Sequence, residues 1–307
     1  MHEVLQDFAT FPHYFSETLR LYRHVSVVCL NTVAGNLETF IKRSFRVRLI
    51  TNTVFPGAYE FDLALIENDH FLLTNVDLRR IQQIADAHDF DAASAEVAER
   101  GGVRLPAPLW DFIDETRQLP VSDRTPYHRA TLNYFLWQVS KYFLIQGDGR
   151  EPYLHLSDLV RFYLREVRRP FRANKEVNEA HLQMDRSTLR SIAARVLIAD
   201  LPPVRGYDKL PPYLHLRETL VRGPFSLTEV LPPYFFFGSR FDDETQYMEW
   251  VRDYLADCAH IQFWLLIVRD EAILPALGRM LDEAGRKTRV FRFPITTGHN
   301  FTYVLAQ

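Results

Sequence analysis

IQFWLLIV, residues 261–268, is the stretch that decides the fold, because every position except Gln262 is apolar. A run this rich in β-branched and aromatic residues is typical of a strand buried on both faces of a parallel sheet. A second run of the same kind, VSVVCL at 25–30, stands near the start of the chain. The two runs together predict a mixed α/β fold built on a largely parallel sheet.

Helices are expected on both sides of the 261–268 strand. Asp242 is expected to cap the first, and Asp270 to cap the second, which should end at Gly285. The apolar residues at helical spacing are Tyr247, Trp250, Val251, Tyr254 and Cys258, then Leu274, Leu277, Met280 and Leu281. Further strands are expected at 234–237, 288–293 and 301–305. The last third of the chain therefore reads βαβαββ.

The first third alternates in a similar way. Strands are expected at 25–30, 47–54 and 61–66, and Leu37, Phe40, Ile41 and Phe45 predict a helix between the first two. Asp77 is expected to cap a further helix with Leu78, Ile81, Ile84 and Ala85 on its apolar face.

The middle of the chain, from about 106 to 200, shows helical periodicity throughout, including at Leu189, Ile192, Ala193, Val196 and Leu197. Proline pairs at 202–203, 211–212 and 232–233 favour extended or turn geometry after it. We therefore expect two Rossmann-like α/β lobes, 1–105 and 206–307, flanking a helical segment, 106–205. The alternative is one composite sheet to which both ends of the chain contribute.

Composition excludes several classes of protein. The chain has 307 residues, of which 47% are hydrophobic and 24% charged, as in ordinary globular proteins. A net charge of −3 gives no general attraction to nucleic acids or acidic membranes. Cys29 and Cys258 lie in apolar runs, which favours buried free thiols over a disulfide. With neither a secretory signal nor an apolar run long enough to span a bilayer, the expected location is the cytoplasm.

YFFFGSRFDDET, residues 234–245, contains the most interesting turn. Ligands of open α/β sheets bind where a strand ends and a helix begins. Gly238 would permit close approach of a ligand, Ser239 could donate a hydrogen bond, Arg240 could hold an anion, and Asp242 opens the helix. The alternative is a simple strand-to-helix turn with Arg240 paired to Asp243 on the surface.

The string FFFGSRF, residues 235–241, resembles the strand-Gly-[Thr/Ser]-Ser-Leu turn with which sirtuin-like domains contact NAD. The resemblance covers seven residues and implies a nucleotide contact at Gly238 and Ser239. The rest of that pattern is absent, because NTVAGN follows the first strand in place of a Gly-Ala-Gly loop and the chain has no His-Gly pair. The likeness favours a nucleotide-like ligand and assigns no family.

Two further polar turns are candidates for the same site. After the 25–30 strand, Asn31, Thr32, Gly35 and Asn36 could cradle an anion at a helix N-terminus, or could form a plain capping turn. Near the end of the chain, the segment ITTGHNF could form a hairpin turn or contribute ligand contacts from Thr297 and Asn300. If the protein is an enzyme, we expect group transfer or hydrolysis that uses Asp243 and the general acid His299.

A basic run suggests a second class of function. Arg161, Arg165, Arg168 and Arg172 share a broad helical face that could contact an anion, a protein partner or, less readily, a nucleic acid. No P-loop, G-x-S-x-G elbow or H-E-x-x-H motif is present, and the histidines and cysteines lack zinc-type spacing, so no metal is expected and the cofactor is unknown. The sequence leaves two hypotheses: a protein that binds a nucleotide-like or other anionic small molecule between two lobes, or a non-catalytic subunit of a larger assembly.

Overall fold

The computed structural model describes residues 25–31, 36–86, 97–119, 126–147, 161, 174–201, 204, 212–224, 244–294 and 300–307. The chain divides into two compact units, which we call the sheet unit and the helical unit. The sheet unit comprises 1–55, 173–209 and 227–307, and the helical unit comprises 56–172 and 210–226. Each unit combines segments that are distant in the sequence, because the two segments of the helical unit interrupt the sheet unit at two places.

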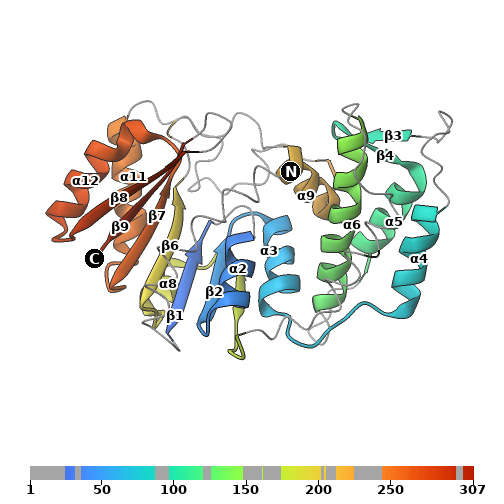
Figure 1. The fold of residues 1–307 in the computed structure, drawn as a ribbon, viewed down its shortest axis with the longest axis horizontal. Coiled ribbons are helices and arrows are strands. Elements are labelled where there is room, and N and C mark those ends of the chain that lie inside the picture. The colour runs from blue at the N-terminus through green and yellow to red at the C-terminus, as the bar shows by residue number, and fades with distance from the viewer. Residues whose placement is uncertain are drawn as a thin grey trace. The chain divides into compact units, whose positions relative to one another are not determined.

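Strands from both ends of the chain form one seven-stranded sheet in the order β5-β2-β1-β6-β7-β9-β8. The strands are β1 (Ser26–Leu30), β2 (Arg48–Thr53), β5 (Glu179–Leu182), β6 (Val196–Leu201), β7 (Phe263–Val268), β8 (Thr288–Pro294) and β9 (Asn300–Ala306). The first five strands of this order run parallel, and β9 is antiparallel to both of its neighbours. In Figure 1 the blue β1 and β2 stand beside the yellow β6 and the orange β7. The composite sheet is therefore correct, and the alternative of two separate Rossmann-like sheets is wrong.

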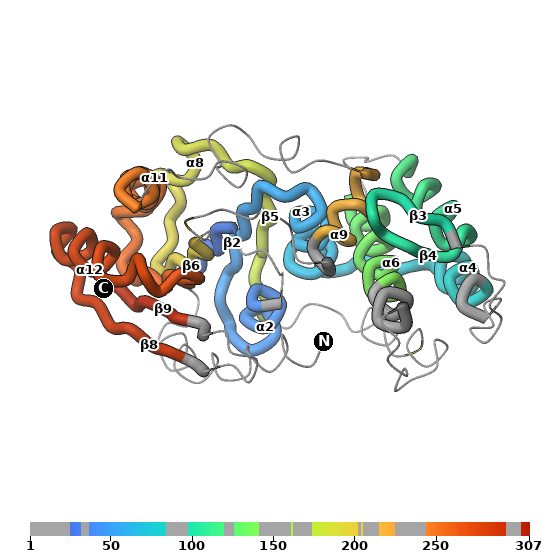
Figure 2. Tube along the Cα trace, turned by 90° about the horizontal axis from the view of Figure 1, so that it is seen from above, coloured from blue at the N-terminus to red at the C-terminus, as the bar shows by residue number. Residues whose placement is uncertain are grey.

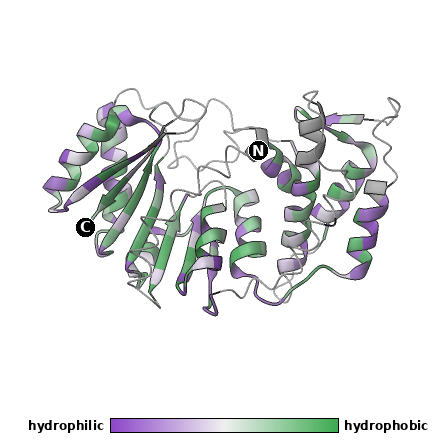
Figure 3. Cartoon of the chain, viewed as in Figure 1, coloured by the Kyte–Doolittle hydropathy of each residue, from purple (hydrophilic) through white to green (hydrophobic). Residues whose placement is uncertain are grey.

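The centre of the sheet is apolar on both faces, and helices cover both. All residues of β6 and β7 are buried, as are the last four of β1. Figure 3 shows these strands as the most continuously hydrophobic elements of the sheet unit. Figure 2 shows α8 (Arg186–Ser191) and α11 (Glu244–Ala256) on one face and α2 (Asn36–Ser44) on the other. Because both faces are covered, continuous apolar runs are stable here as strands.

The expected helical segment between 106 and 200 contains two strands that the sequence did not predict. Val196 and Leu197 lie in β6, and β5 at 179–182 forms an edge strand. The helical spacing of Leu189 through Leu197 is misleading, because α8 ends at Ser191 and the apolar run that follows is buried on both sides. A short apolar run fits a buried strand and a buried helix equally well, so periodicity could not separate the two.

The last third of the chain has the expected order wherever the structure describes it. After β7, Asp270 accepts a hydrogen bond from the Ala272 amide and caps the turn η2 (Glu271–Ile273). The helix α12 (Leu274–Glu283) follows and ends before Gly285, whose φ of 73° lies in the left-handed region. The hairpin of β8 and β9 then completes the sheet. The strand expected at 234–237 lies outside the described residues.

In its described residues, the helical unit packs five main helices and a hairpin around its own core. They are α3 (Pro56–Asp62), α4 (Asn75–Asp86), α5 (Ala107–Arg117), α6 (Pro126–Gly147) and α9 (Pro212–Arg222), with β3 (Val97–Arg100) paired to β4 (Val103–Pro106). Its buried centre contains Trp110, Phe135 and Leu216. Pro212 stands at the start of α9, where proline needs no hydrogen-bond partner, so the second proline pair precedes a helix. No helix among the described residues is long and apolar enough to cross a membrane.

Two details of the helical unit differ from the sequence-based expectation. The predicted strand at 61–66 is helical, because α3 begins at Pro56 and continues into the π-helical turn η1 (Leu63–Glu67). Its apolar run is buried inside a helical core instead of a sheet. Asp77 also does not occupy the cap position: Thr74 precedes α4 and its hydroxyl accepts from the Asp77 amide, while Asp77 accepts from the Thr74 amide.

Both cysteines are buried free thiols, as expected. Cys29 lies in β1 and Cys258 follows α11, and neither has any exposed surface. Burial raises the pKa of the Cys258 thiol to about 12, so this group is un-ionised at neutral pH.

Candidate functional site

The strand order of the sheet reverses direction between β1 and β6. From β1 the chain continues through α2 to β2 on one side, whereas β6 is followed along the chain by α11 and β7 on the other. Open parallel sheets bind ligands outside the carboxyl ends of the strands that flank such a switch point. Leu30 of β1 pairs with Ala199 of β6, so the next residues along these strands, Asn31 and Asp200, are level at this edge.

Asn31 is held rigidly at the end of β1. Its φ of 54° is left-handed, a conformation that asparagine tolerates better than most residues. Its amide N–H donates to the Asn52 carbonyl at 2.9 Å, and its side-chain Nδ2 donates to the Tyr254 hydroxyl at 2.9 Å. The side chain is fully buried, yet its Oδ1 has no hydrogen-bond partner within the described part of the chain. A buried acceptor without a donor costs about 1 to 3 kcal/mol. Asn31 Oδ1 is one of several such atoms among the described residues, with Asn133 Oδ1 and Gln138 Oε1 in the helical unit.

Asp200 supplies a carboxylate at the same edge. Arg269, directly after β7, donates to it in a bidentate manner, with Nε to Oδ1 at 2.8 Å and Nη2 to Oδ2. The Asp200 side chain is 5% exposed. Burial, then the proximity of Cys258 and Asp200, raises the pKa of the Tyr254 hydroxyl well above its usual value. Tyr254 therefore keeps its proton and can donate it while accepting from Asn31.

The neighbouring strands are tied together beside this cluster. The Asn52 side chain at the end of β2 accepts from the Met184 amide at 2.8 Å through Oδ1, and the Gln183 amide donates to the Thr53 carbonyl at 2.9 Å. These contacts fix the chain after β5 to the end of β2. The side-chain oxygen of Asn52 is thus occupied by a structural contact, so Asn31 and Asp200 are the candidate ligand contacts among the side chains described at the switch point.

The helix that follows β1 along the chain, α2, carries a further carboxylate in its first turn. The turn contains Glu38, which has no exposed surface. Helix N-termini attract anions because their free N–H groups point outwards and the helix dipole is positive there. A carboxylate inside the first turn uses that attraction and repels a second anion. The acceptors described in this region are therefore Asn31 Oδ1 and the carboxylates of Asp200 and Glu38, and the cation beside Asp200 is Arg269.

Three of the residues expected from the sequence to form the site lie at this edge. Asn31 ends β1, Asn36 begins α2, and Asn300 begins β9, whose first residues pair with the end of β7. Only the backbone positions of Asn36 and Asn300 are described. The other expected contacts fall outside the described residues; they are Thr32, Gly35, Gly238, Ser239, Arg240, Asp242, Asp243, Thr297 and His299. Their ligand-binding and catalytic roles stay predictions.

The predicted basic stripe is described at one position. Arg161 is helical and exposed, whereas Arg165, Arg168 and Arg172 fall outside the described residues. The partner contact expected for this stripe, and with it the alternative of a non-catalytic subunit, stays a prediction.

Sequence reasoning did not identify Asp200, Arg269 or Tyr254 as site residues. Tyr254 was assigned only to the apolar face of a helix, and Asp200 only to the end of a helical segment. A signal for Asp200 was present, because VLIAD ends in the first charged residue after an apolar run and a proline pair follows it. Assigning that run to a strand would have placed the carboxylate at a strand end.

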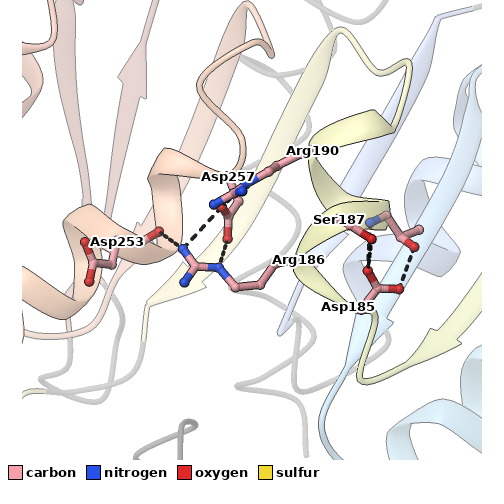
Figure 4. A network of polar contacts seen from close by, with 7 residues as sticks. Asp185, Arg186, Ser187, Arg190, Asp253 and Asp257 are labelled. Carbon is pink, nitrogen blue, oxygen red and sulfur yellow. Dashed lines mark hydrogen bonds and ion pairs between the residues drawn. The ribbon is translucent and has the colours of Figure 1, made fainter.

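A second polar network in the sheet unit has a structural role (Figure 4). Asp257, after α11, is 4% exposed and accepts from two arginines of α8, Arg186 Nε at 2.5 Å and Arg190 Nε at 2.7 Å. Asp185 caps α8 by accepting from the Thr188 amide at 2.9 Å. The network joins α8 to α11 on the face of the sheet.

The side chains described at the switch point offer hydrogen-bond donors and acceptors. Among the residues that the structure describes, no group of three His, Cys, Asp or Glu side chains could hold a metal ion. No protein-family model matches the sequence, and a search of curated proteins finds no relative. Function must therefore be inferred from the site itself.

Proposed function

We propose that this protein binds a nucleoside-containing small molecule at the carboxyl edge of its sheet, next to Asn31 and Asp200. The observation that carries the proposal is the buried Asn31 amide, whose Oδ1 lacks a partner at the switch point between β1 and β6 within the described part of the chain. Folded proteins rarely leave such an atom unpaired, and functional sites are where the exceptions gather.

The strand order of the sheet supports a nucleoside-containing ligand. Numbered along the sequence, the five parallel strands have the order 3-2-1-4-5, which is the order of Rossmann folds that bind nucleotides at this switch point. A fold by itself does not define a function, so the analogy selects the compounds to test first. The ligand contacts predicted from the sequence at 238–242 precede α11 along the chain.

A thermal-shift experiment on the full chain tests the proposal. The compounds are adenosine, AMP, ATP, NAD and S-adenosylmethionine. Saturation at about 100 times Kd stabilises the folded state by about 2.7 kcal/mol, which raises Tm by roughly 4 °C for a chain of this length. We expect at least one compound to produce such a shift.

A matched pair of variants locates the binding. Asn31→Gly removes the amide while keeping the left-handed backbone, because glycine adopts positive φ without strain. Gln183→Gly makes the same change at an exposed residue that also has positive φ, 55°, just after β5. The ligand-induced shift should fall in the first variant and persist in the second. Equal shifts in both, or no shift with any compound, would contradict the proposal.

A further inference from the structure

The polar groups at the switch point restrict the kind of ligand that can bind there. Asn31 presents a buried carbonyl-type oxygen without a partner among the described residues, and Asp200 presents carboxylate oxygens that can each accept more than the one bond given by Arg269. Both groups require hydrogen-bond donors from a ligand. Phosphates at neutral pH offer almost only acceptors and negative charge.

The usual place for a phosphate in this topology carries an acidic side chain here. Rossmann folds bind the pyrophosphate at the N-terminus of the helix after the first strand, through a glycine-rich turn. Here that helix is α2, and its first turn carries the buried Glu38. The preceding sequence, NTVAGN, also lacks the G-x-G-x-x-G pattern that brings backbone N–H groups to a phosphate.

We infer that the site recognises the donor groups of its ligand, either hydroxyls of a ribose or a cationic group, and selects against phosphorylated nucleosides. This inference rests on the proposed function, because it names the ligand chemistry of the same site. Asn31 and Asp200 accept from the ligand, and Tyr254 holds the Asn31 amide so that Oδ1 faces the donor. The inferred ligands are neutral or cationic and differ from the anionic ones expected from the sequence, an expectation that stays a prediction.

Isothermal titration calorimetry with pairs of compounds tests the inference. Adenosine and AMP differ only by the phosphate, and we expect adenosine to bind at least tenfold more tightly. Adenosine and 2′,3′-dideoxyadenosine differ only by the two hydroxyls, and S-adenosylmethionine and S-adenosylhomocysteine differ by a methyl group and its positive charge. A loss of about tenfold or more on removal of the hydroxyls identifies hydroxyl donors, since each hydrogen bond is worth about 0.5 to 1.5 kcal/mol. Tighter binding of S-adenosylmethionine than of S-adenosylhomocysteine identifies a cationic group.

Variants separate the electrostatic part of the inference from a loss of fold. Glu38→Gln removes one negative charge at constant shape, so the affinity ratio of adenosine to AMP should fall severalfold. Tyr254→Phe removes the partner of Asn31 Nδ2 and keeps Oδ1, so the adenosine-to-AMP ratio should be retained even where overall affinity drops.

The outcomes distinguish this inference from the proposed function. Binding of AMP or ATP more tightly than adenosine overturns the inference and leaves the proposed function standing. The same holds if removing the hydroxyls and removing the sulfonium charge both leave affinity unchanged. An absence of binding by every compound overturns the inference and the proposed function together.

Discussion

Two arginine–carboxylate pairs, one in each unit, are nearly equally shielded from water. In the helical unit Arg129 pairs with Glu60, with side chains 27% and 4% exposed; in the sheet unit Arg269 pairs with Asp200, at 30% and 5%. Their surroundings differ. Glu60 lies among helices, where Asn133 also donates to it and Glu218 is near, whereas Asp200 lies at the edge of a sheet beside Tyr254.

The two units also differ in the polar residues that they bury in their interiors. Burial raises the pKa of Glu60, and Arg129 and Asn133 offset this only in part. Helices α3, α6 and α9 can each direct a polar side chain inwards, so the helical unit buries Glu60, Asn133, Arg217 and Glu218. The central strands β1, β6 and β7 have apolar interiors and bring polar groups only to their ends. The same kind of pair should therefore support stability in one unit and ligand binding in the other.

Replacing the arginine of each pair should have the largest effect on the free energy of unfolding. The two losses should differ, although the two pairs are about equally exposed. Arg129→Met leaves a buried carboxylate near Glu218 and should lower the free energy of unfolding by about 3 to 4 kcal/mol. Arg269→Met, the matched variant, should cost about 1 to 2 kcal/mol, because Asp200 lies at a strand end. Denaturant unfolding of the full chain measures both, and equal losses would contradict the comparison.

The stability of the Arg129→Met variant should also depend on pH, because Arg129 affects the pKa of Glu60. A carboxyl group whose pKa is higher in the folded than in the unfolded state stabilises the protein at low pH, and this contribution is lost as pH rises through the folded pKa. Without Arg129 the pKa of Glu60 should rise further. The deficit of the variant should therefore be small near pH 4 and grow towards neutrality.

Substitution of Gly57 should have the next largest effect. Its amide donates to Glu218 Oε2 at 2.8 Å, and a Cβ at this position would lie 2.7 Å from the other carboxylate oxygen. Gly57→Ala should therefore destabilise the protein by about 2 to 3 kcal/mol, the worth of a hydrogen bond to a buried charge. Gly278→Ala in α12 is the control, because a Cβ there meets nothing within 4 Å. That variant should gain about 0.5 to 1 kcal/mol, and a loss similar to that of Gly57→Ala would rule out the steric explanation.

The smallest effect is expected at Asp257, where the ion pairs are open to water. Burial acts to raise the pKa of Asp257, but hydrogen bonds from Arg186 and Arg190 outweigh it and lower that pKa. Both arginines are more than 60% exposed, so Asp257→Asn should cost only about 1 kcal/mol at neutral pH. A carboxyl group with a lowered folded pKa stabilises the protein above its unfolded pKa and loses this effect on acidification. The difference between wild type and variant should therefore shrink as the pH falls below about 3.9, the ordinary pKa of aspartate, and a constant difference would contradict the assignment.

Long apolar runs predicted much of the sheet unit. The strands at 25–30, 47–54 and 261–268, the helices after the first and the third, and the final hairpin are all present. Predictions failed where a short apolar run fits more than one environment: FDLALI at 61–66 is helical and VLIA at 196–199 is a strand. Both runs are buried on all sides, so their side-chain pattern carries no period.

From the sequence, only the position of the candidate site at the end of a strand could be predicted. Asn31 follows from the end of an obvious strand, but the setting of its Oδ1 depends on Tyr254, 223 positions further along the chain. Asp200 and Arg269, 69 positions apart, meet because β6 and β7 are neighbours in the sheet.

The sequence alone determined which segments are apolar enough to form the core, because hydrophobic burial and backbone preference are local properties of the residues. It also determined that the strands would alternate with helices in the two ends of the chain. Only the tertiary structure decided that both ends share one sheet, and where its order reverses. Strand pairing joins segments more than a hundred residues apart, such as β1 and β6, and the amino-acid pattern of each strand is compatible with several neighbours.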